Sequence, residues 1–165
     1  MSYNVVTQLH PNGVIVRSAL DKAGVKGVIV ETAESSPTAV AAAEQLGIFV
    51  GQIANSLVFE ADGSPLLVMT SGAHRVDTDR LAAQLGCDVI RRPGADFVRE
   101  HTGQPIGGVA PVGHPQPLTT IVDEALGQYD EIWAAAGHPH YVFPTNFAEL
   151  VAMTNGQVLS VGLEG

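Results

Sequence analysis

The chain has a single cysteine, Cys87, and few aromatic residues, which make up 5% of its 165 residues. One cysteine excludes an intrachain disulfide and a zinc site built from several thiolates. No apolar run approaches the roughly 20 residues that span a bilayer. The first residues also lack the basic start and the apolar stretch of a secretory signal. The sequence therefore predicts a soluble protein with a cytoplasmic location.

Basic residues are also scarce, because eight Lys and Arg stand against seventeen Asp and Glu and the formal net charge is -9. Contacts from Lys and Arg to phosphate supply most of the non-specific affinity for nucleic acid, so this balance opposes non-specific binding to nucleic acid. A nucleic-acid partner would need a local basic patch, for which the middle of the chain is the candidate. The arginines there are Arg75, Arg80, Arg91, Arg92 and Arg99. The simpler interpretation is that these arginines are scattered and solvated.

The chain does have many hydrophobic residues, 45% of the total against 15% charged, which is typical of a folded domain with a substantial core. We therefore expect residues 1–165 to form a single domain. Strands outnumber helices in the predicted order, and the helices fall irregularly between groups of strands. This pattern predicts an α+β fold with a mixed, largely antiparallel sheet rather than a doubly wound parallel sheet.

Apolar periodicity and turn residues predict the individual elements. Asp62-Gly63 is a strong hairpin signal between two β-rich runs. Ser36 is the expected N-cap of the second helix, with Pro37 at its first position, and Asp77 is the expected N-cap of the third. Helices are predicted over residues 12–25, 39–46, 78–85, 95–101 and 144–153, and strands over 27–31, 52–60, 65–71, 87–91, 118–122, 131–136, 141–143 and 157–161.

The segment from Thr102 to Pro115 has four glycines and three prolines in fourteen residues, which excludes a helix interior and disfavours a central strand. Gly107 and Gly108 have no Cβ, so a ligand can approach their N–H groups closely. Pro105 and Pro111 restrict φ on either side. Successive free N–H groups in a stiff loop suit a carbonyl oxygen or an oxyanion. The alternative is a rigid connection between two strands.

No motif for covalent or nucleotide chemistry is present. The chain lacks a Gly-x-Ser-x-Gly elbow and a phosphate loop. Residues 103–108 lack the preceding strand and following helix of a dinucleotide fingerprint. The surroundings of Cys87 in the sequence are typical of a buried thiol. His138 and His140 lie two residues apart, with His114 elsewhere, and this spacing matches no usual zinc motif. We therefore expect no metal and no cofactor, and expect His140 to face a cavity shared with the glycine loop. A metal-dependent hydrolase built on the three histidines is the alternative.

Two runs of residues are distinctive when taken together. Residues 102–115 contain Thr-Gly, Ile-Gly-Gly-Val-Ala-Pro and Gly-His-Pro, and residues 130–140 read Asp-Glu-Ile-Trp-Ala-Ala-Ala-Gly-His-Pro-His. With Leu57-Val58-Phe59 and residues 72–77, they resemble the YbaK/ProX family over about residues 35–160. Members of this family are free-standing relatives of the editing domain of bacterial prolyl-tRNA synthetase. The resemblance implies a barrel-like mixed sheet and hydrolysis, in trans, of the ester between a wrong amino acid and tRNA.

The resemblance also implies roles for individual residues. The Gly-x-x-x-Pro loop from Gly107 to Pro111 is similar to the loop whose backbone holds the aminoacyl carbonyl, so Gly107 and Gly108 are the expected catalytic donors. Arg75 is the expected contact with tRNA. A mischarged tRNA and an aminoacyl-tRNA synthetase are the implied partners, with no membrane and no DNA. The substrate-binding residues that the resemblance implies are Val109, Ala110, Pro111, Gly137 and His140.

The chain differs from the family pattern at Asn55. Family members commonly carry a lysine two residues before Leu-Val-Phe, where it is thought to contact the terminal nucleotide of tRNA, and Asn55 stands at that position here. An amide brings no charge, and charge-assisted hydrogen bonds are about twice as strong as neutral ones. Two hypotheses follow. The chain is a deacylase in which water or a tRNA hydroxyl attacks a carbonyl polarised by the loop, with Asn55 at the site, or it binds an aminoacyl or nucleotide-like ligand, or a synthetase, without hydrolysis.

Overall fold

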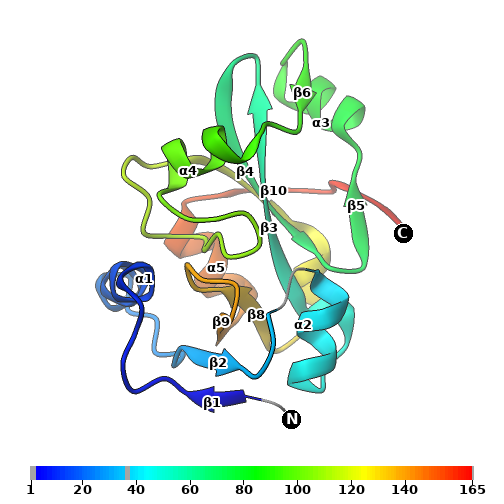
Figure 1. The fold of residues 1–165 in the computed structure, drawn as a ribbon. Helices are drawn as coiled ribbons and strands as arrows, with labels where there is room; N and C mark the ends of the chain where they lie inside the picture. The colour runs from blue at the N-terminus through cyan, green and yellow to red at the C-terminus, as the bar shows by residue number, and fades with distance from the viewer. Residues whose placement is uncertain (1–2, 36–37, 165) are drawn as a thin grey trace.

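A mixed β-sheet surrounded by short helices forms the fold in a computed structural model that describes residues 3–35 and 38–164 (Figure 1). The predicted α+β class is therefore confirmed. The strands of the sheet are β1 (Tyr3–Val5), β2 (Val30–Thr32), β3 (Ile53–Ala61), β4 (Ser64–Ser71), β6 (Ile90–Arg91), β7 (Thr119–Asp123), β8 (Ile132–Ala135), β9 (Tyr141–Thr145) and β10 (Gln157–Leu159). The helices are α1 (Pro11–Lys22), α2 (Ala39–Leu46), α3 (Thr78–Leu85), α4 (Ala95–Thr102) and α5 (Phe147–Thr154), with 3-10 turns η1 (Val50–Gln52) and η2 (Glu124–Gln128).

The strand order is β1-β2-β9-β8-β3-β4-β7-β10, and β6 pairs with β3 beside this path. Antiparallel pairs predominate, as predicted, and the parallel pairs are β3 with β8, β4 with β7, and β7 with β10. Along the described residues the path ends at β1 and β10 without closing, so the sheet is open and only barrel-like in its curvature around the core.

The longest pairing in the sheet is the β3–β4 hairpin, which joins Ala54–Ala61 to Ser64–Ser71. Asp62 and Gly63 form its turn with φ of 49° and 89°, the left-handed values that a two-residue hairpin requires. The Asp-Gly signal in the sequence therefore predicted this turn correctly. The hairpin gives the molecule a rigid wall along one edge of β3.

The other edge of β3 is paired only at its ends. β8 pairs with Ile53 and Ala54, and β6 pairs with Glu60 and Ala61. Within the described chain no strand pairs with this edge from Asn55 to Phe59. Five consecutive residues of a central strand therefore have an open edge, and the glycine-rich loop lies across from them.

Several helix boundaries follow their predicted signals. The Asp77 side chain accepts a hydrogen bond from the Arg80 N–H at the start of α3, and Gly86 ends that helix with φ of 72°. At α2 the N-cap is Thr38, which accepts from the Ala41 N–H, so the prediction of Ser36 as N-cap was wrong. Ser36 and Pro37 themselves lie outside the described residues.

The last helix begins later than predicted. Pro144 and Thr145 belong to β9, and Asn146 caps α5 by accepting from the Glu149 N–H. A proline fits there because β2 pairs with β9 only at Tyr141 and Val142, so that ladder has ended before Pro144. The sequence pattern also missed β1 and the two-stranded sheet of β5 (His74–Val76) with β11 (Gly162–Glu164).

The glycine-rich loop is anchored in the main hydrophobic core by its buried residues Gly108 to Pro111, whereas Ile106 and Gly107 are exposed. Val109 and Ala110 are 3% and 0% exposed and pack in one cluster with Val16 and Leu20 of α1 and with Phe143. Burial of this kind fixes the loop backbone relative to the sheet. In the part of the chain that the structure describes, no helix is long and apolar enough to cross a membrane.

Candidate functional site

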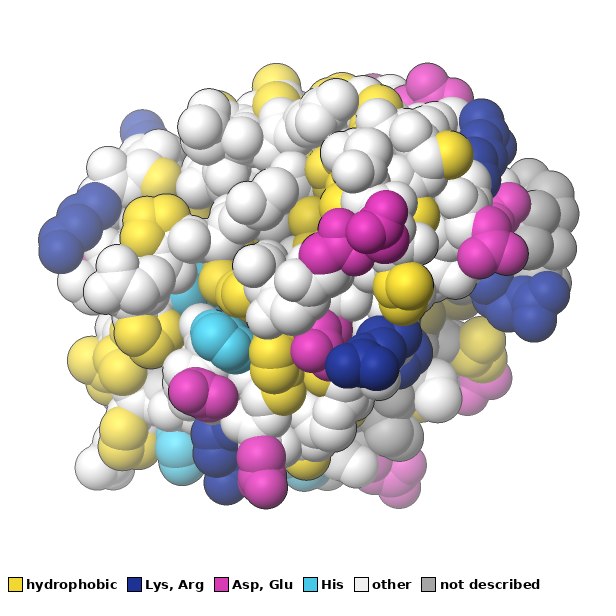
Figure 2. Space-filling view, turned by 90° about the horizontal axis from the view of Figure 1, so that it is seen from above, with side chains coloured by type: hydrophobic (Ala, Val, Ile, Leu, Met, Phe, Trp, Pro, Cys, Tyr) yellow, Lys and Arg dark blue, Asp and Glu magenta, His cyan; other side chains and the backbone are white. Residues whose placement is uncertain are grey.

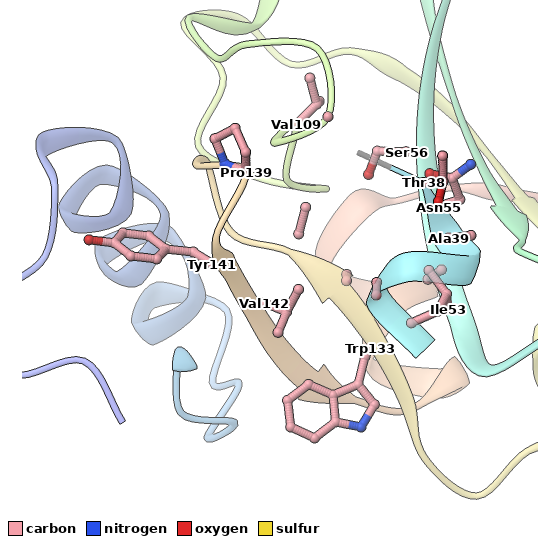
Figure 3. A pocket seen from close by; sticks show the side chains of 15 residues that line it. Thr38, Ala39, Ile53, Asn55, Ser56, Val109, Trp133, Pro139, Tyr141 and Val142 are labelled. Carbon is pink, nitrogen blue, oxygen red and sulfur yellow. The ribbon is translucent and has the colours of Figure 1, made fainter. Parts of the chain in front are cut away.

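A small pocket lies between the glycine-rich loop and the open edge of β3, and we call it the main pocket (Figure 3). Its cavity volume is about 50 Å³. Figure 3 shows Asn55 and Thr38 on one side, Val109 and Pro139 on the other, and Trp133 below. The lining residues are Thr38, Ala39, Ala42, Ile53, Ala54, Asn55, Ser56, Gly107, Val109, Trp133, Ala134, Ala135, Pro139, Tyr141 and Val142.

The side chains of the main pocket are short and mostly apolar. Five of its residues are alanines, contributed by α2, β3 and β8. Thr38, Asn55 and Ser56 contribute polar side chains to the pocket. The Tyr141 hydroxyl points away from it and accepts a hydrogen bond from the His10 N–H. A space of this kind suits a small side chain with a polar group attached.

The loop enters the pocket through a tight turn. The Gly108 N–H donates to the Pro105 carbonyl at 2.9 Å, and Gly107 has φ of 88°, which favours glycine at the third position of such a turn. Gly107 and Val109 line the pocket. Among the described residues, the N–H groups of Gly107 and Val109 have no hydrogen-bond acceptor, whereas that of Gly108 is already used. The available donors are therefore Gly107 and Val109.

Gly108 serves a different purpose, the close approach of two backbones. A Cβ at this position would lie 2.8 Å from the His138 carbonyl carbon and 3.0 Å from its Cα and nitrogen. The Gly108 carbonyl accepts from the Gly137 N–H at 2.8 Å, and the Gly137 carbonyl accepts from the Asn12 side chain at 3.1 Å. The loop and the segment Gly137 to His140 are thus joined by direct backbone contact. From the sequence we expected only that the two segments share a cavity.

Two polar side chains, the buried Gln104 and the half-buried His114, hold the far side of the loop. The Gln104 side chain, 2% exposed, accepts from the Ala110 N–H at 2.7 Å and donates to the Val112 carbonyl at 3.2 Å. Nε2 of His114 donates to the Ala110 carbonyl at 2.8 Å. Burial lowers the pKa of His114, and the bond to Ala110 offsets this only in part, so the ring is neutral near pH 7. Ala110 is therefore fixed at both its N–H and its carbonyl.

Neither His138 nor His140 lines the main pocket, although His140 was expected to face a cavity shared with the glycine loop. Nδ1 of His140 hydrogen-bonds the Thr32 carbonyl at 3.0 Å, and its neighbours Pro139 and Tyr141 line the pocket in its place. The His138 ring lies 5.2 Å from that of His10 and 5.6 Å from that of His140. Burial and these two rings lower the pKa of His138, while Glu31 acts in the opposite direction.

A second pocket continues from the main pocket along β3, and we call it the side pocket. It shares Asn55, Ser56, Gly107 and Val109 with the main pocket and has a cavity volume of about 110 Å³. Its other lining residues are Leu57, Val58, Arg92, Pro93, Val98 and Ile106. The two pockets therefore form one continuous site with Asn55 and Gly107 at the junction.

Comparison with known proteins identifies the kind of domain. A family model described as an aminoacyl-tRNA editing domain matches residues 33–153. The chain belongs to this family. The expected resemblance is therefore confirmed.

Two solved structures are similar to this chain. One, provisionally described as a trans-editing enzyme for prolyl-tRNA synthetase, is 39% identical with a TM-score of 0.88, over 94% of this chain and 99% of that chain. The hypothetical protein APE2540 is 25% identical with a TM-score of 0.83, over 90% and 99% of the two chains.

Curated relatives of the editing domain fall into two groups. The uncharacterized protein YwhH of Bacillus subtilis is 30% identical over 110 residues, 66% of this chain and 69% of that protein. A proline–tRNA ligase of Limosilactobacillus fermentum is 29% identical over 90 residues, which are 52% of this chain and only 16% of the ligase. The match thus covers a small part of a much longer synthetase.

The structure brings some of the predicted site residues together and leaves others apart. Asn55, Gly107 and Val109 of the editing domain line the main pocket. Pro111 lies on the opposite side of the loop, in a hollow that His114 also lines, and Arg75 lies exposed on β5 outside both pockets. Among residues 3–35 and 38–164, no three His, Cys, Asp or Glu side chains are placed to hold a metal ion.

Sequence reasoning missed Gln104, Thr38 and Trp133. Gln104 lies inside the glycine-rich segment, and a long amide between Gly103 and Pro105 was the signal that could have singled it out. Thr38 lines the pocket because it caps α2 there. Trp133 belongs to the run that carries the family resemblance, but no local pattern placed it at a pocket, because it reaches the pocket through the pairing of β8 with β3.

Proposed function

We propose that this chain hydrolyses, in trans, the ester that joins a small mischarged amino acid to tRNA. The observation that carries the proposal is the pair of N–H groups at Gly107 and Val109, which have no acceptor among the described residues and lie beside a small apolar pocket. Membership of the aminoacyl-tRNA editing family and the likeness to a trans-editing enzyme support it. The relatives favour one substrate class, the proline-specific tRNA charged with a wrong amino acid.

In this mechanism the loop acts on the ester carbonyl. The two N–H groups donate to the carbonyl oxygen and stabilise the negative charge that develops on it as the tetrahedral intermediate forms. One such donor is typically worth about 10²–10³ in rate. The nucleophile is water, held next to the carbonyl with the help of the neighbouring hydroxyl of the terminal ribose. The ester C–O bond breaks, and the ribose oxygen leaves with a proton from that water. An aminoacyl ester is already reactive, so no Ser-His-Asp triad is required.

The main pocket holds the amino-acid side chain. Its alanine-rich wall and volume of about 50 Å³ fit a side chain of one or two heavy atoms better than a branched or aromatic one. Asn55 lies at the junction of the two pockets, where its amide can hydrogen-bond a hydroxyl of the substrate. His140 acts indirectly, because its bond to the Thr32 carbonyl fixes the segment that carries Pro139.

The test is single-turnover deacylation with the protein in excess over tRNA charged with alanine, cysteine, serine, threonine or phenylalanine. We expect the alanyl ester to be among those hydrolysed well above the buffer rate, and the phenylalanyl ester to decay at the buffer rate because its ring does not fit the pocket. Half-lives equal to the buffer control for all five esters would contradict the proposal.

Asn55 favours a second candidate function, that of a module which binds an aminoacyl or nucleotide-like ligand, or a synthetase, without hydrolysis. The neutral amide stands where the family commonly has a charged lysine, and the net charge of -9 weakens affinity for tRNA.

Asn55→Lys separates the two functions in the same assay. If the parent is inactive and the variant hydrolyses alanyl-tRNA, the binding function is supported, because a single charge restores a lost activity. If the parent is already active, the binding function fails. The matched control is Asn146→Asp or another change at a helix cap remote from the pockets, which alters a capping residue without touching the site.

A further inference from the structure

Residues 3–32, which we call the N-terminal segment, pack against one wall of the main pocket from outside. This segment contains β1, α1 and β2, and the family model begins only after it. β2 pairs with β9 at Tyr141 and Val142, and the Tyr3 ring of β1 lies 5.9 Å from the ring of Trp133. Tyr141, Val142 and Trp133 line the main pocket. The N-terminal segment therefore supports lining residues without reaching the pocket itself.

Helix α1 is joined to the same wall through its first turn. Figure 3 shows the Tyr141 ring directed away from the pocket toward α1, and its hydroxyl accepts from the His10 N–H at 2.9 Å. Gly13 allows the helix to approach this ring, because a Cβ there would lie 2.8 Å from Cε2 of Tyr141. So close a fit leaves the ring little room to shift. The position of β9 therefore depends on α1.

Asn12 connects this turn of α1 to the glycine-rich loop. The helix is capped by Nδ1 of His10, which accepts from the Asn12 N–H at 3.1 Å, so the Asn12 side chain is not needed as a cap. The half-buried Asn12 amide donates to the Gly137 carbonyl at 3.1 Å, and the Gly137 N–H donates to the Gly108 carbonyl at 2.8 Å. A chain of hydrogen bonds thus runs from α1 through Gly137 to the loop, past the Pro139 side of the pocket.

The fit to the main pocket is what distinguishes esters that differ only in the amino acid. Surface charge acts equally on all of them, and Figure 2 shows Lys and Arg as separate groups among acidic and apolar side chains on the face it views. The cavity of about 50 Å³ is small. One methylene more or less in such a pocket typically changes discrimination by about 10–200-fold. The position of the wall therefore decides which side chain is accepted.

We propose that Asn12 is a positioning residue that sets the width of the main pocket, so that the N-terminal segment determines the size of the accepted side chain. Asn12 lines neither the main pocket nor the side pocket, and it acts through Gly137. When its bond to the Gly137 carbonyl is lost, the wall moves outward and a larger side chain fits. This inference rests on the proposed function for the identity of the occupant, an amino acid esterified to tRNA.

The experiment compares two substrate analogues, alanine and valine, each linked to the 3′ position of adenosine through an amide that resists hydrolysis. Their Kd values are measured on the whole chain by amide NMR. The variant is Asn12→Asp, which keeps the shape of the side chain but places a carboxylate against the Gly137 carbonyl. A carboxylate in the first turn is favourable for a helix, so α1 itself should not be weakened.

We expect the parent to bind the alanine analogue more tightly than the valine analogue. In Asn12→Asp the ratio of the two Kd values should fall about tenfold, the value of roughly one methylene of fit. The Gly137 amide resonance should move upfield as its bond to Gly108 weakens. Asn12→Ala removes the donor without adding charge and should lower the ratio in the same direction.

Gln8→Glu is the matched control. It makes the same change from amide to carboxylate at an exposed position of the N-terminal segment, and it should leave the Kd ratio within about twofold of the parent. A parent-like ratio in Asn12→Asp, or an equal fall in Gln8→Glu, overturns the inference. Failure of the parent to bind either analogue also overturns it.

Binding of the analogues separates this inference from the proposed function. If charged tRNA is not hydrolysed but the Kd ratio falls in Asn12→Asp as predicted, the proposed function fails and the positioning role of Asn12 stands. If alanyl-tRNA is hydrolysed and Asn12→Asp changes neither the Kd ratio nor the relative rates for alanyl and valyl esters, only the positioning role fails.

Discussion

The two walls of the main pocket are built in different ways. On one side, β3 receives its shape from eight paired residues of β4, and its pocket-facing groups follow from strand alternation. On the other side, the loop from Gly107 to Pro111 has no ladder and depends on Gln104, His114 and the contact between Gly108 and His138. Substitutions remote from the pocket should therefore damage the loop wall, whereas on β3 only the side chains at the pocket should matter.

The largest effect is expected for Gly108→Ala. Its Cβ would meet the His138 backbone at 2.8 Å, so the loop must move and carry the Gly107 and Val109 donors with it. Overpacking of this kind costs about 1–3 kcal/mol, and a 1 Å displacement of a positioning group costs about 10²-fold in rate. Urea unfolding and single-turnover deacylation measure the two effects. Gly94→Ala is the control, because nothing lies within 4 Å of its Cβ position, and it should behave as the parent.

Gln104→Met should come next. Methionine fills the same space but leaves the Ala110 N–H and the Val112 carbonyl without their buried partner, at about 1–3 kcal/mol for each group. We expect a lower urea midpoint and about a tenfold lower deacylation rate as the loop loosens. Gln116→Met, at an exposed position just after the glycine-rich segment, is the matched control. Equal behaviour of the two variants would mean that Gln104 does not hold the loop.

On the β3 wall, Asn55→Ala should leave the fold nearly unchanged. The backbone there is fixed by β4, so the free energy of unfolding should change by at most about 0.5 kcal/mol. Loss of one neutral hydrogen bond to substrate should weaken half-saturation by about two- to tenfold. A stability loss as large as that of Gly108→Ala would show that the two walls are not built differently.

The smallest effect is a pH dependence of stability from His114. Burial lowers its pKa in the folded state, so below the ordinary histidine pKa the unfolded chain binds the extra proton more readily. The contribution of neutral His114 to the free energy of unfolding is complete above about pH 6.5. It is lost as the pH falls, first through the pKa of His114 in the unfolded chain and then through its lower pKa in the folded chain. His114→Gln should flatten this part of the curve when urea unfolding is measured between pH 7.5 and 5, an interval chosen around the ordinary histidine value. An unchanged slope would contradict the assignment, and His138 supplies a remaining slope of the same sign.

Local signals in the sequence predicted the β3–β4 hairpin and α3 correctly. Asp62-Gly63 predicted the hairpin and Asp77 with Gly86 predicted α3, because turn and cap preferences act over a few residues. The open edge of β3 could not be predicted, since it depends on where β8 and β6 stop pairing.

The loop was predicted in place but not in detail. The resemblance located Gly107 to Pro111, yet composition cannot tell which N–H groups are free. That depends on the turn in which Gly108 donates to Pro105, and on Gln104 taking the N–H of Ala110. Two adjacent glycines thus have separate purposes, the left-handed φ at Gly107 and the close backbone contact at Gly108.

The most direct test of the account is to observe the loop donors with a substrate analogue. Alanine linked to the 3′ position of adenosine through an amide resists hydrolysis and keeps the carbonyl, so its binding can be followed by amide proton NMR. The account predicts downfield shifts at Gly107 and Val109, with little change at Gly108 and Ala110, whose N–H groups are already bonded. Shifts at Gly108 and Ala110 with none at Gly107 and Val109 would contradict it.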